Sequence, residues 1–514
     1  MASKARQFGS TTWPQRPGLT LIEMLVSMVI TMLMILALAQ AFQIVSATIS
    51  YNRSTIEMAS QLRSTSLLLQ RDLEGLTVPA LPLANPSSAE GYFAYIEGQD
   101  KDYVTGDTDT TVGDTDDVLM FTTQSAGSPY TGQYSGAVVE SPDAEIIWWL
   151  SGRDFNGDNV TAVNERFIYR RVLVVRPDLD RSGALTTWPR TFSTNTTGLR
   201  QLRSQLAAFY NNNDISVRMR WLVSGANVTV DLFANSLSDL SNRENRFAHY
   251  PIVLDNGTIR LVTASDFPTF PVYPYVLDAN RDSITSLDRL RYFGTRKGED
   301  VVLQNTLAFD VRAYDVTAQV RAHPGEDGRW GVATQDDDQN GTVDDITEAG
   351  WFDSDDEAVT PGDRGFAAAR QIGTGAFVDL YYRSVFSYGA GVRSQFSGSP
   401  HVRSGLSGLS SGAPLSFSQP LEATWDTWSM HYESDGKKQD ISPLMPSNIV
   451  DTDTDEGTNG FDGDGVNGVD DPGERETSPP YNVPLRGIQI GLRIMETDNR
   501  LVRQASVVVN FIPE

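Results

Sequence analysis

The chain has 514 residues with a hydrophobic share of 40%, which is sufficient for a folded core and unlike the composition of a disordered chain. Its net charge of −25 argues against binding to the phosphate backbone of a nucleic acid. The absence of cysteine excludes disulfides, thiolate metal sites and cysteine nucleophiles.

The first 45 residues combine a basic leader with an apolar run of membrane-spanning length. Residues 1–18 contain three basic residues and no acid, and the apolar run extends from Leu19 to about Val45. As a helix this run would be roughly 40 Å long, enough to cross a bilayer. Glu23 lies at its edge, where burial of a carboxylate is costly unless the charge is paired.

Helical periodicity continues beyond the apolar run and predicts one helix from Leu19 to about Glu74, with Gly75 as its stop. The apolar stripe of the outer half is expected to dock a globular head. It consists of Val45, Ile49, Ile56, Ala59, Leu62, Ser66, Leu69, Leu73 and Leu76. Charged residues predict a solvated face made of Arg53, Glu57, Arg63, Arg71 and Asp72.

The segment Gly18-Leu19-Thr20-Leu21-Ile22-Glu23 and the apolar stretch after it resemble the class III signal of type IV pilins and type II secretion pseudopilins. The resemblance implies cleavage between Gly18 and Leu19 by a prepilin peptidase and N-methylation of Leu19, which stands where the family usually has Phe. It also implies that Glu23 pairs with the N-terminal amine of a neighbouring subunit.

Within this family the chain is most similar to the large minor pseudopilin J or the similar minor pilin W, with an enlarged head. The resemblance implies a structural subunit of a type II secretion or type IV pilus-like filament. Its expected partners are the prepilin peptidase, other pilin or pseudopilin subunits and the inner membrane, which it crosses once with the head in the periplasm or in a cell-surface filament.

Four alternatives to this interpretation remain open, and one of them is an exported enzyme, whose head would show a deep pocket with convergent polar groups. An ordinary secretory signal would be cut after Ala37-Leu38-Ala39 or after Ala39-Gln40-Ala41, in the middle of the predicted helix. A plain membrane anchor would show no processing at Gly18. A membrane-tethered adhesin or binding module could use a pilin-type export signal without polymerising.

Beyond residue 90 the sequence predicts a mainly antiparallel β-rich head, so the fold class is α+β with a long N-terminal membrane-spanning helix. A short helix is expected over Ser236–Phe247, and a C-terminal hairpin is expected where alternating isoleucines and leucine lead to a Glu496–Arg500 turn and a return over Leu501–Phe511. Predicted strands cover Asp117–Thr123, Glu145–Leu150, Arg166–Val175, Ser216–Val223 and Thr306–Tyr314.

The expected organisation has five parts. They are a leader over 1–18, a transmembrane and assembly helix over 19–75, a β-rich head with acidic loops over 76–384, a Ser/Gly-rich loop or linker over 385–420, and a C-terminal β portion over 421–514.

Three acidic loops have the spacing of oxygen ligands for Ca²⁺, and in one of them, over 154–165, the match is partial because Asn159 replaces the turn glycine. Two of them share the thirteen-residue frame D-x-D-x-x-x-x-V-D-D-x-x-E, which predicts a structural calcium site in each and a role in ordering exposed loops. The alternative is that they are solvated turns. The candidate ligands are Asp336, Asp338, Asn340, Asp344, Asp345 and Glu348 in one loop, Asp462, Asp464, Asn467, Asp470, Asp471 and Glu474 in the second, and Asp154, Asn156, Asp158 and Glu165 in the third.

The sequence shows no catalytic constellation, and we expect no enzyme. The four histidines are scattered, and neither a zinc-protease helix motif, a serine nucleophile elbow nor a phosphate-binding loop is present. Carboxylate pairs such as Asp379 with Asp426 arise by chance in a chain with 66 acidic residues.

Overall fold

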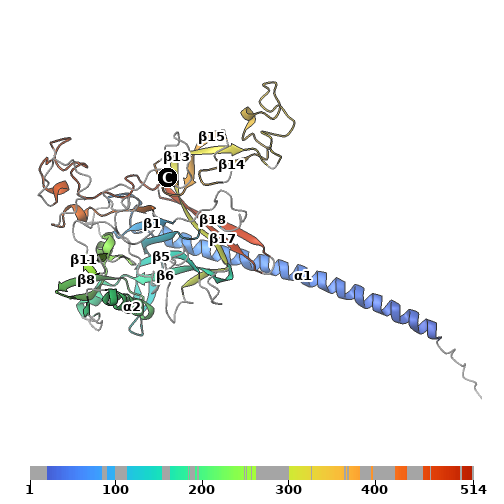
Figure 1. The fold of residues 1–514 in the computed structure, drawn as a ribbon, viewed down its shortest axis with the longest axis horizontal. Helices are drawn as coiled ribbons and strands as arrows, with labels where there is room; N and C mark the ends of the chain where they lie inside the picture. The colour runs from blue at the N-terminus through green and yellow to red at the C-terminus, as the bar shows by residue number, and fades with distance from the viewer. Residues whose placement is uncertain are drawn as a thin grey trace, which may run out of the picture. The chain divides into compact units, whose positions relative to one another are not determined.

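One helix, α1, runs without a break from Leu21 to Glu74 (Figure 1). It contains neither glycine nor proline, and it ends before Gly75, as predicted. The chain forms two compact units, Met1–Glu57 and Met58–Glu514. The computed structural model describes residues 20–83, 90–98, 113–152, 163–182, 185, 191–193, 196–247, 249, 252–255, 258–261, 300–325, 327–363, 366, 370–382, 395–396, 423–436, 455–463, 465–497 and 500–511.

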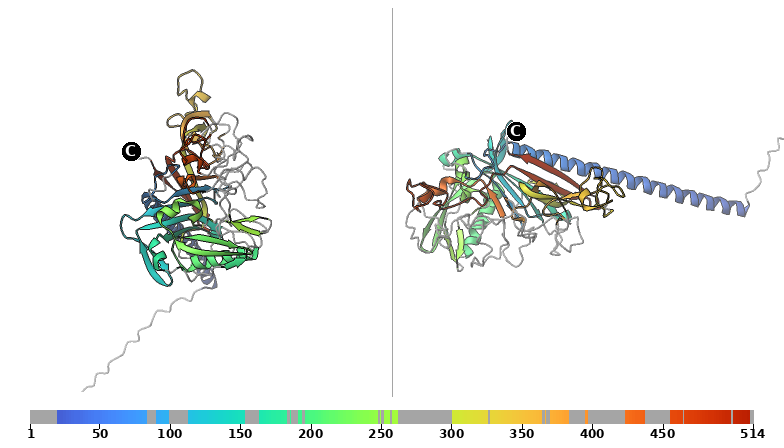
Figure 2. Two further views of the ribbon diagram at one scale, coloured as in Figure 1. Left: turned by 90° about the vertical axis from the view of Figure 1, so that its left-hand side faces the viewer. Right: turned by 90° about the horizontal axis from the view of Figure 1, so that it is seen from above.

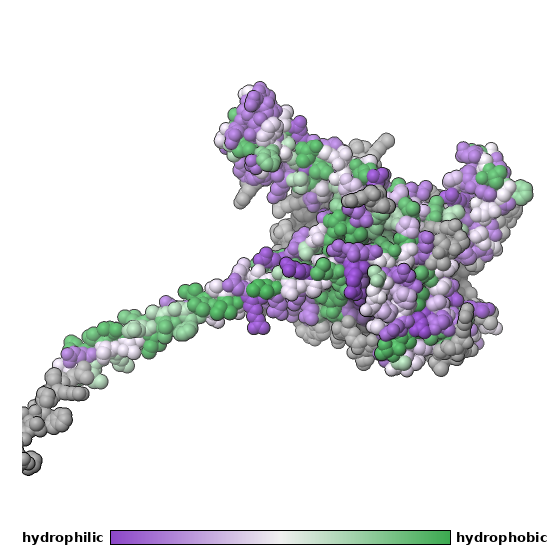
Figure 3. All heavy atoms as spheres, turned by 180° about the vertical axis from the view of Figure 1, so that it is seen from behind, coloured by the Kyte–Doolittle hydropathy of each residue, from purple (hydrophilic) through white to green (hydrophobic). Residues whose placement is uncertain are grey.

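In the first unit, the apolar side chains of α1 are exposed. Leu21 is 84% exposed, Leu33 61% and Ile49 62%, and an almost continuous apolar band covers this part of the helix (Figure 3). By length and composition α1 can cross a membrane. An exposed apolar surface of this extent is unfavourable in water, so it requires lipid or other helices around it.

The second unit is built on a six-stranded antiparallel sheet with the strand order β12-β6-β5-β2-β1-β16. Its strands come from distant parts of the chain, because β16 at one edge pairs with β1. Their bounds are β1 Phe93–Glu97, β2 Val118–Gln124, β5 Asp143–Gly152, β6 Arg166–Val174, β12 Val301–Gln304 and β16 Ala423–Asp426.

A second sheet has the order β14-β13-β17-β18, with β15 also paired to β13. The long strand β13 pairs with β17 along its first half, and the two lie side by side in Figure 2. Along its second half it pairs with β14 and β15. The strands are β13 Thr306–His323, β14 Glu357–Val359, β15 Arg370–Val378, β17 Gly487–Met495 and β18 Val502–Asn510.

Within the described residues, the other α-helices and strands form two helices, a three-stranded sheet of order β7-β9-β8 and two hairpins, and short 3-10 turns connect some of them. The helices are α2 Thr196–Asn212 and α3 Leu237–Ser241. The strands are β3 Tyr130–Tyr134, β4 Ala137–Ser141, β7 Thr191–Ser193, β8 Val217–Ser224, β9 Asn227–Ala234, β10 Ile252–Asp255 and β11 Thr258–Leu261.

The six-stranded sheet is buried on both faces because alternate residues of its strands enter two different hydrophobic clusters. Ile147 and Trp149 of β5 join the cluster that contains residues of α2 and β9. Ile146 and Trp148 join the other cluster, together with residues of β13 and β17. This second cluster also contains four residues of α1, namely Met58, Leu62, Leu69 and Leu73.

The docked end of α1 agrees only in part with the predicted stripe. Leu62, Leu69 and Leu73 are buried as predicted, but Ile56 is 70% exposed. The placement of Asp72 on a solvated face is wrong, because its side chain is fully buried. Its carboxylate accepts two hydrogen bonds from Arg170 of β6, at 2.6 and 2.7 Å, and one from the indole of Trp148 at 3.1 Å.

The C-terminal hairpin is confirmed as a core element. β17 and β18 pair antiparallel in continuous register, with Ile490 opposite Val507 and Leu492 opposite Ala505. The alternating apolar residues of β17 are at most 1% exposed, whereas Val508 on β18 is 51% exposed. One face of this hairpin therefore closes the core and the other faces outward.

The segment around α3 and the Ser/Gly-rich segment 385–420 are the two remaining local predictions. The helix predicted over Ser236–Phe247 is too long, because α3 ends at Ser241 and a separate 3-10 turn covers Arg243–Asn245. Asn242 between them is extended, with φ −85° and ψ 126°, and this breaks the helix. The predicted loop over 385–420 lies outside the described residues apart from 395–396.

Candidate functional site

The N-terminal end of α1 is fixed by a reciprocal contact between Thr20 and Glu23. The hydroxyl of Thr20 accepts a hydrogen bond from the Glu23 amide at 3.3 Å. Glu23 Oε2 accepts hydrogen bonds from the amide and the hydroxyl of Thr20, at 2.8 and 2.9 Å. This is a capping box, which satisfies backbone amides that the first helical turn leaves open.

The capping box gives Glu23 a partner within its own chain. Both contacts use Oε2, and the side chain is exposed at the edge of the apolar segment. The sequence pattern Thr20-x-x-Glu23 is the usual signal for such a cap and was not used in the sequence interpretation. Gly18 and Leu19, the predicted processing residues, lie outside the described residues.

The acidic loops 336–348 and 462–474 share a backbone structure as well as a sequence frame. In each loop the last glutamate is buried and accepts two backbone hydrogen bonds from the same frame positions. Glu348 Oε1 and Oε2 accept from the amides of Asp337 and Asp345, at 2.5 and 3.1 Å. Glu474 accepts in the same way from Gly463 and Asp471.

The two loops also share a hydrogen bond and a backbone conformation at the same positions of the frame. The amide two residues before each frame donates to its ninth residue, from Thr334 to Asp344 and from Gly460 to Asp470. Left-handed backbone recurs at the fourth, sixth and ninth positions. The residues are Gln339, Gly341 and Asp344 in one loop, with φ of 58°, 93° and 56°, and Gly465, Asn467 and Asp470 in the other, with φ of 71°, 64° and 53°.

The loop 336–348 brings three of its predicted ligands together. One carboxylate oxygen from each of Asp336, Asp338 and Glu348 lies within 4.8 Å of those of the other two. Asn340 lies among the acids, because its Nδ2 donates to Asp338 at 3.0 Å and to Asp345 at 2.9 Å. Hydrogen bonds from Thr347 and Asn340 lower the pKa of Asp345. The arrangement offers hard oxygen ligands in one turn of chain.

Only some of the other predicted ligands lie among the described residues. In the loop 462–474, Asp464 lies outside the described residues, whereas Asp462 is exposed and Glu474 is buried. In the third loop, Asp154, Asn156 and Asp158 lie outside the described residues. Glu165 is buried at the end of a 3-10 turn that directly precedes β6.

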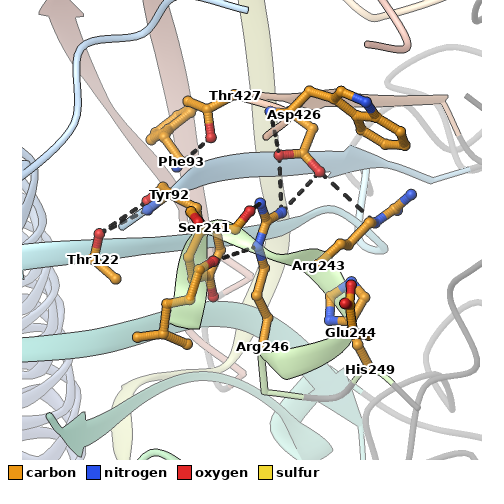
Figure 4. A network of polar contacts seen from close by, with 12 residues as sticks. Tyr92, Phe93, Thr122, Ser241, Arg243, Glu244, Arg246, His249, Asp426 and Thr427 are labelled. Carbon is orange, nitrogen blue, oxygen red and sulfur yellow. Dashed lines mark hydrogen bonds and ion pairs between the residues drawn. The ribbon is translucent and has the colours of Figure 1, made fainter. Parts of the chain in front are cut away.

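A buried polar network connects the segment around α3 to β1 and β16 (Figure 4). Arg246 donates to both carboxylate oxygens of Asp426 at 2.8 Å, and its guanidinium lies over the ring of Tyr92, 4.1 Å from the centroid. Burial alone would raise the pKa of Asp426, but Arg246 and Arg243 hold it below its ordinary value. Burial and the same two arginines lower the pKa of His249 to about 3.

This network fixes the chain after α3 against the six-stranded sheet. Asp379, which was considered together with Asp426 in the sequence, is held by a different cation, because Arg312 Nε lies 3.3 Å from its carboxylate. The two acids therefore lie in separate networks, and Asp379 shares its arginine with Asp310.

One group of acids was not singled out from the sequence. Glu97, Asp114 and Asp117 are buried in the second unit, and one oxygen from each lies within 4.8 Å of the others. The available signal was the cluster of three aspartates over 114–117, directly before the apolar strand β2.

A family model described as the prokaryotic N-terminal methylation motif matches residues 14–39. No curated protein and no solved structure matches the chain. The matched residues include Gly18, Leu19 and Glu23 and the start of α1. The chain thus carries a class III prepilin signal, which is consistent with the pilin and pseudopilin family and with processing by a prepilin peptidase. Together with the apolar helix, this signal indicates an exported protein that is anchored in a membrane.

Proposed function

We propose that this chain is a structural, minor pilin- or pseudopilin-like subunit of a type II secretion or type IV pilus-like filament. Prepilin peptidase cuts between Gly18 and Leu19 in the inner membrane, Leu19 is N-methylated, and α1 packs against the helices of other subunits. The observation that carries the proposal is the methylation motif at residues 14–39, at the start of an unbroken apolar helix.

The structure of α1 supports this role in two ways. Its first half exposes apolar side chains that need a lipid or helical environment. Its last part enters the hydrophobic cluster of the head through Leu62, Leu69 and Leu73, and it is held there by the buried ion pair of Asp72 with Arg170. The similarity to minor pseudopilin J or minor pilin W belongs to the same proposal.

The experiment is to replace Glu23 with Ala and to measure filament incorporation and membrane export separately. If Glu23 pairs with the amine of a neighbouring subunit, incorporation falls at least about tenfold while export persists. The matched control is Glu57→Ala, which removes another exposed acid of α1 outside the apolar segment. Unchanged incorporation of the Glu23 variant contradicts the assembly role and favours a membrane-tethered adhesin or binding module.

We also propose that the loops 336–348 and 462–474 each bind a structural Ca²⁺. Two observations support this proposal: the repeated hydrogen bonds of Glu348 and Glu474, and the convergence of Asp336, Asp338 and Glu348. A divalent cation would relieve the mutual repulsion of the carboxylates and would order loops that no disulfide can fix.

Calorimetric titration of the detergent-solubilised full chain with Ca²⁺ tests the loop sites. Binding with dissociation constants between about 10⁻⁶ and 10⁻³ M is expected. Asp338→Asn and Asp462→Asn should each remove one bound ion, whereas Asp353→Asn, an exposed acid outside both frames, should remove none. Equal stoichiometry in all three variants would show that the loops are solvated turns.

A further inference from the structure

A buried group of carboxylates lies where β1 ends and β2 begins. Ile96 of β1 pairs with Val118 of β2, and this register places Glu97 beside Asp117 on the same face of the sheet. Glu97 is 4% exposed, Asp114 1% and Asp117 0%. One oxygen from each carboxylate lies within 4.8 Å of those of the other two.

Backbone amides from three parts of the chain hold these carboxylates in place. Asp117 accepts hydrogen bonds from Gly98 at 3.0 Å and from Val311 of β13 at 2.7 Å. Glu97 Oε2 accepts one from Leu380, after β15, at 3.3 Å. The acids therefore lie where the six-stranded sheet meets the second sheet, and their positions are set by the backbone.

The surroundings of this group are strongly negative. Burial first, and then the neighbouring carboxylates, raise the pKa of Glu97 and the pKa of Asp114 well above their ordinary values. The same causes raise the pKa of Asp117, although the hydrogen bonds from Val311 and Gly98 act to lower it. Three further acids, Asp116, Asp310 and Asp379, are buried close by, at 3%, 7% and 5% exposure. Arg312 Nε contacts two of them, at 3.0 Å from Asp310 and 3.3 Å from Asp379.

A second observation at this place is independent of the carboxylates. Tyr95 precedes Glu97 by two residues on β1, so the two side chains share one face of the sheet. Tyr95 is 0% exposed, and its hydroxyl has no hydrogen-bond partner among the residues that the structure describes. Buried tyrosine hydroxyls normally have a partner.

We propose that Glu97, Asp114 and Asp117 hold one interior divalent cation of the hard, oxygen-preferring class, with Ca²⁺ as the best fit. Three carboxylates without a nitrogen or sulfur ligand select such a cation. The ion supplies the positive charge that the buried acids require, and a water bound to it accepts the hydrogen bond from Tyr95. The cation clamps the end of β1 to the start of β2, and Asp117 links this site to β13 through the amide of Val311.

The test uses the full chain in detergent, with the loops disabled by Asp338→Asn and Asp462→Asn, so that the interior site is measured alone. After removal of metal with a chelator, Ca²⁺ is added and followed by calorimetry and by the midpoint of thermal unfolding. One ion should bind per chain, and the midpoint should rise. Glu97→Gln should abolish both effects, and Tyr95→Phe should weaken binding about tenfold or more.

The variant Glu97→Gln also separates metal binding from packing. Without Ca²⁺ this variant should unfold at or above the temperature of its parent, because a neutral amide avoids the cost of burying a carboxylate beside other acids. With Ca²⁺ it should unfold below the temperature of its parent. The matched control is Glu145→Gln, which changes a fully buried glutamate of another network and should leave the Ca²⁺-induced shift intact. The proposal is overturned if the loop-disabled parent binds no Ca²⁺, or if Glu97→Gln binds it as tightly as the parent.

Discussion

The ion pair between Asp72 and Arg170 should decide how firmly the end of α1 is held in the head. Asp72→Asn keeps the size of the side chain but removes a charge that is fully buried and accepts three hydrogen bonds from Arg170 and Trp148. Removing one partner of a buried pair costs about 3–5 kcal/mol, since the other charge is left uncompensated. Arg170 is 14% exposed and regains some hydration, so the lower end, about 3 kcal/mol, is expected.

The assay is chemical unfolding of the detergent-solubilised chain, followed by tryptophan fluorescence. Trp148 donates to Asp72, so loss of this contact changes the surroundings of one of the nine tryptophans of the chain. The control is Glu74→Gln, an exposed acid of the same helix that only accepts a hydrogen bond from Gln70, and its cost should stay below about 0.5 kcal/mol. A cost below about 1 kcal/mol for Asp72→Asn, or equal costs for both variants, would refute the reasoning.

Two further changes test the interior of the head. His249 has a folded-state pKa of about 3, below its unfolded value, so its stabilising contribution is complete above pH 6.5. Below that pH the contribution to the free energy of unfolding falls by about 1.4 kcal/mol per pH unit. In His249→Phe, the free energy of unfolding measured from pH 7 to pH 4 should lack this dependence on pH. A dependence equal to that of the parent would contradict a buried neutral imidazole. Leu492→Ala, at a fully buried position of β17, should lower the free energy of unfolding in urea by about 2–5 kcal/mol. Val508→Ala, on the exposed face of the hairpin, should lower it by less than about 1 kcal/mol. Similar losses in the two variants would contradict the assigned faces.

Local patterns predicted a large part of the fold. The strands expected over Asp117–Thr123 and Arg166–Val175 correspond within one residue to β2 and β6, and the alternation of β17 identified its buried face. The end of α1 at Glu74 followed from Gly75 and the prolines after it. These features depend on short-range periodicity and on the backbone limits of glycine and proline, which a sequence displays directly.

Contacts between distant residues could not be predicted in the same way. Asp72 looked solvated because its partner Arg170 lies 98 positions away, and nothing near Asp72 indicates the pairing. β13 extends well beyond the expected Tyr314, because its polar second half is stabilised by β14 and β15. The convergence of Glu97 and Asp117 depends on the register of β1 and β2, which the sequence leaves open.

The most direct test of the proposed function is the N-terminus of the mature protein. The chain should be purified from membranes of cells with an active prepilin peptidase, and its N-terminal peptide should be analysed by mass spectrometry. The account predicts a chain that begins with N-methylated Leu19. A chain that begins at Gln40 or Phe42, or one that keeps residues 1–18, would contradict it.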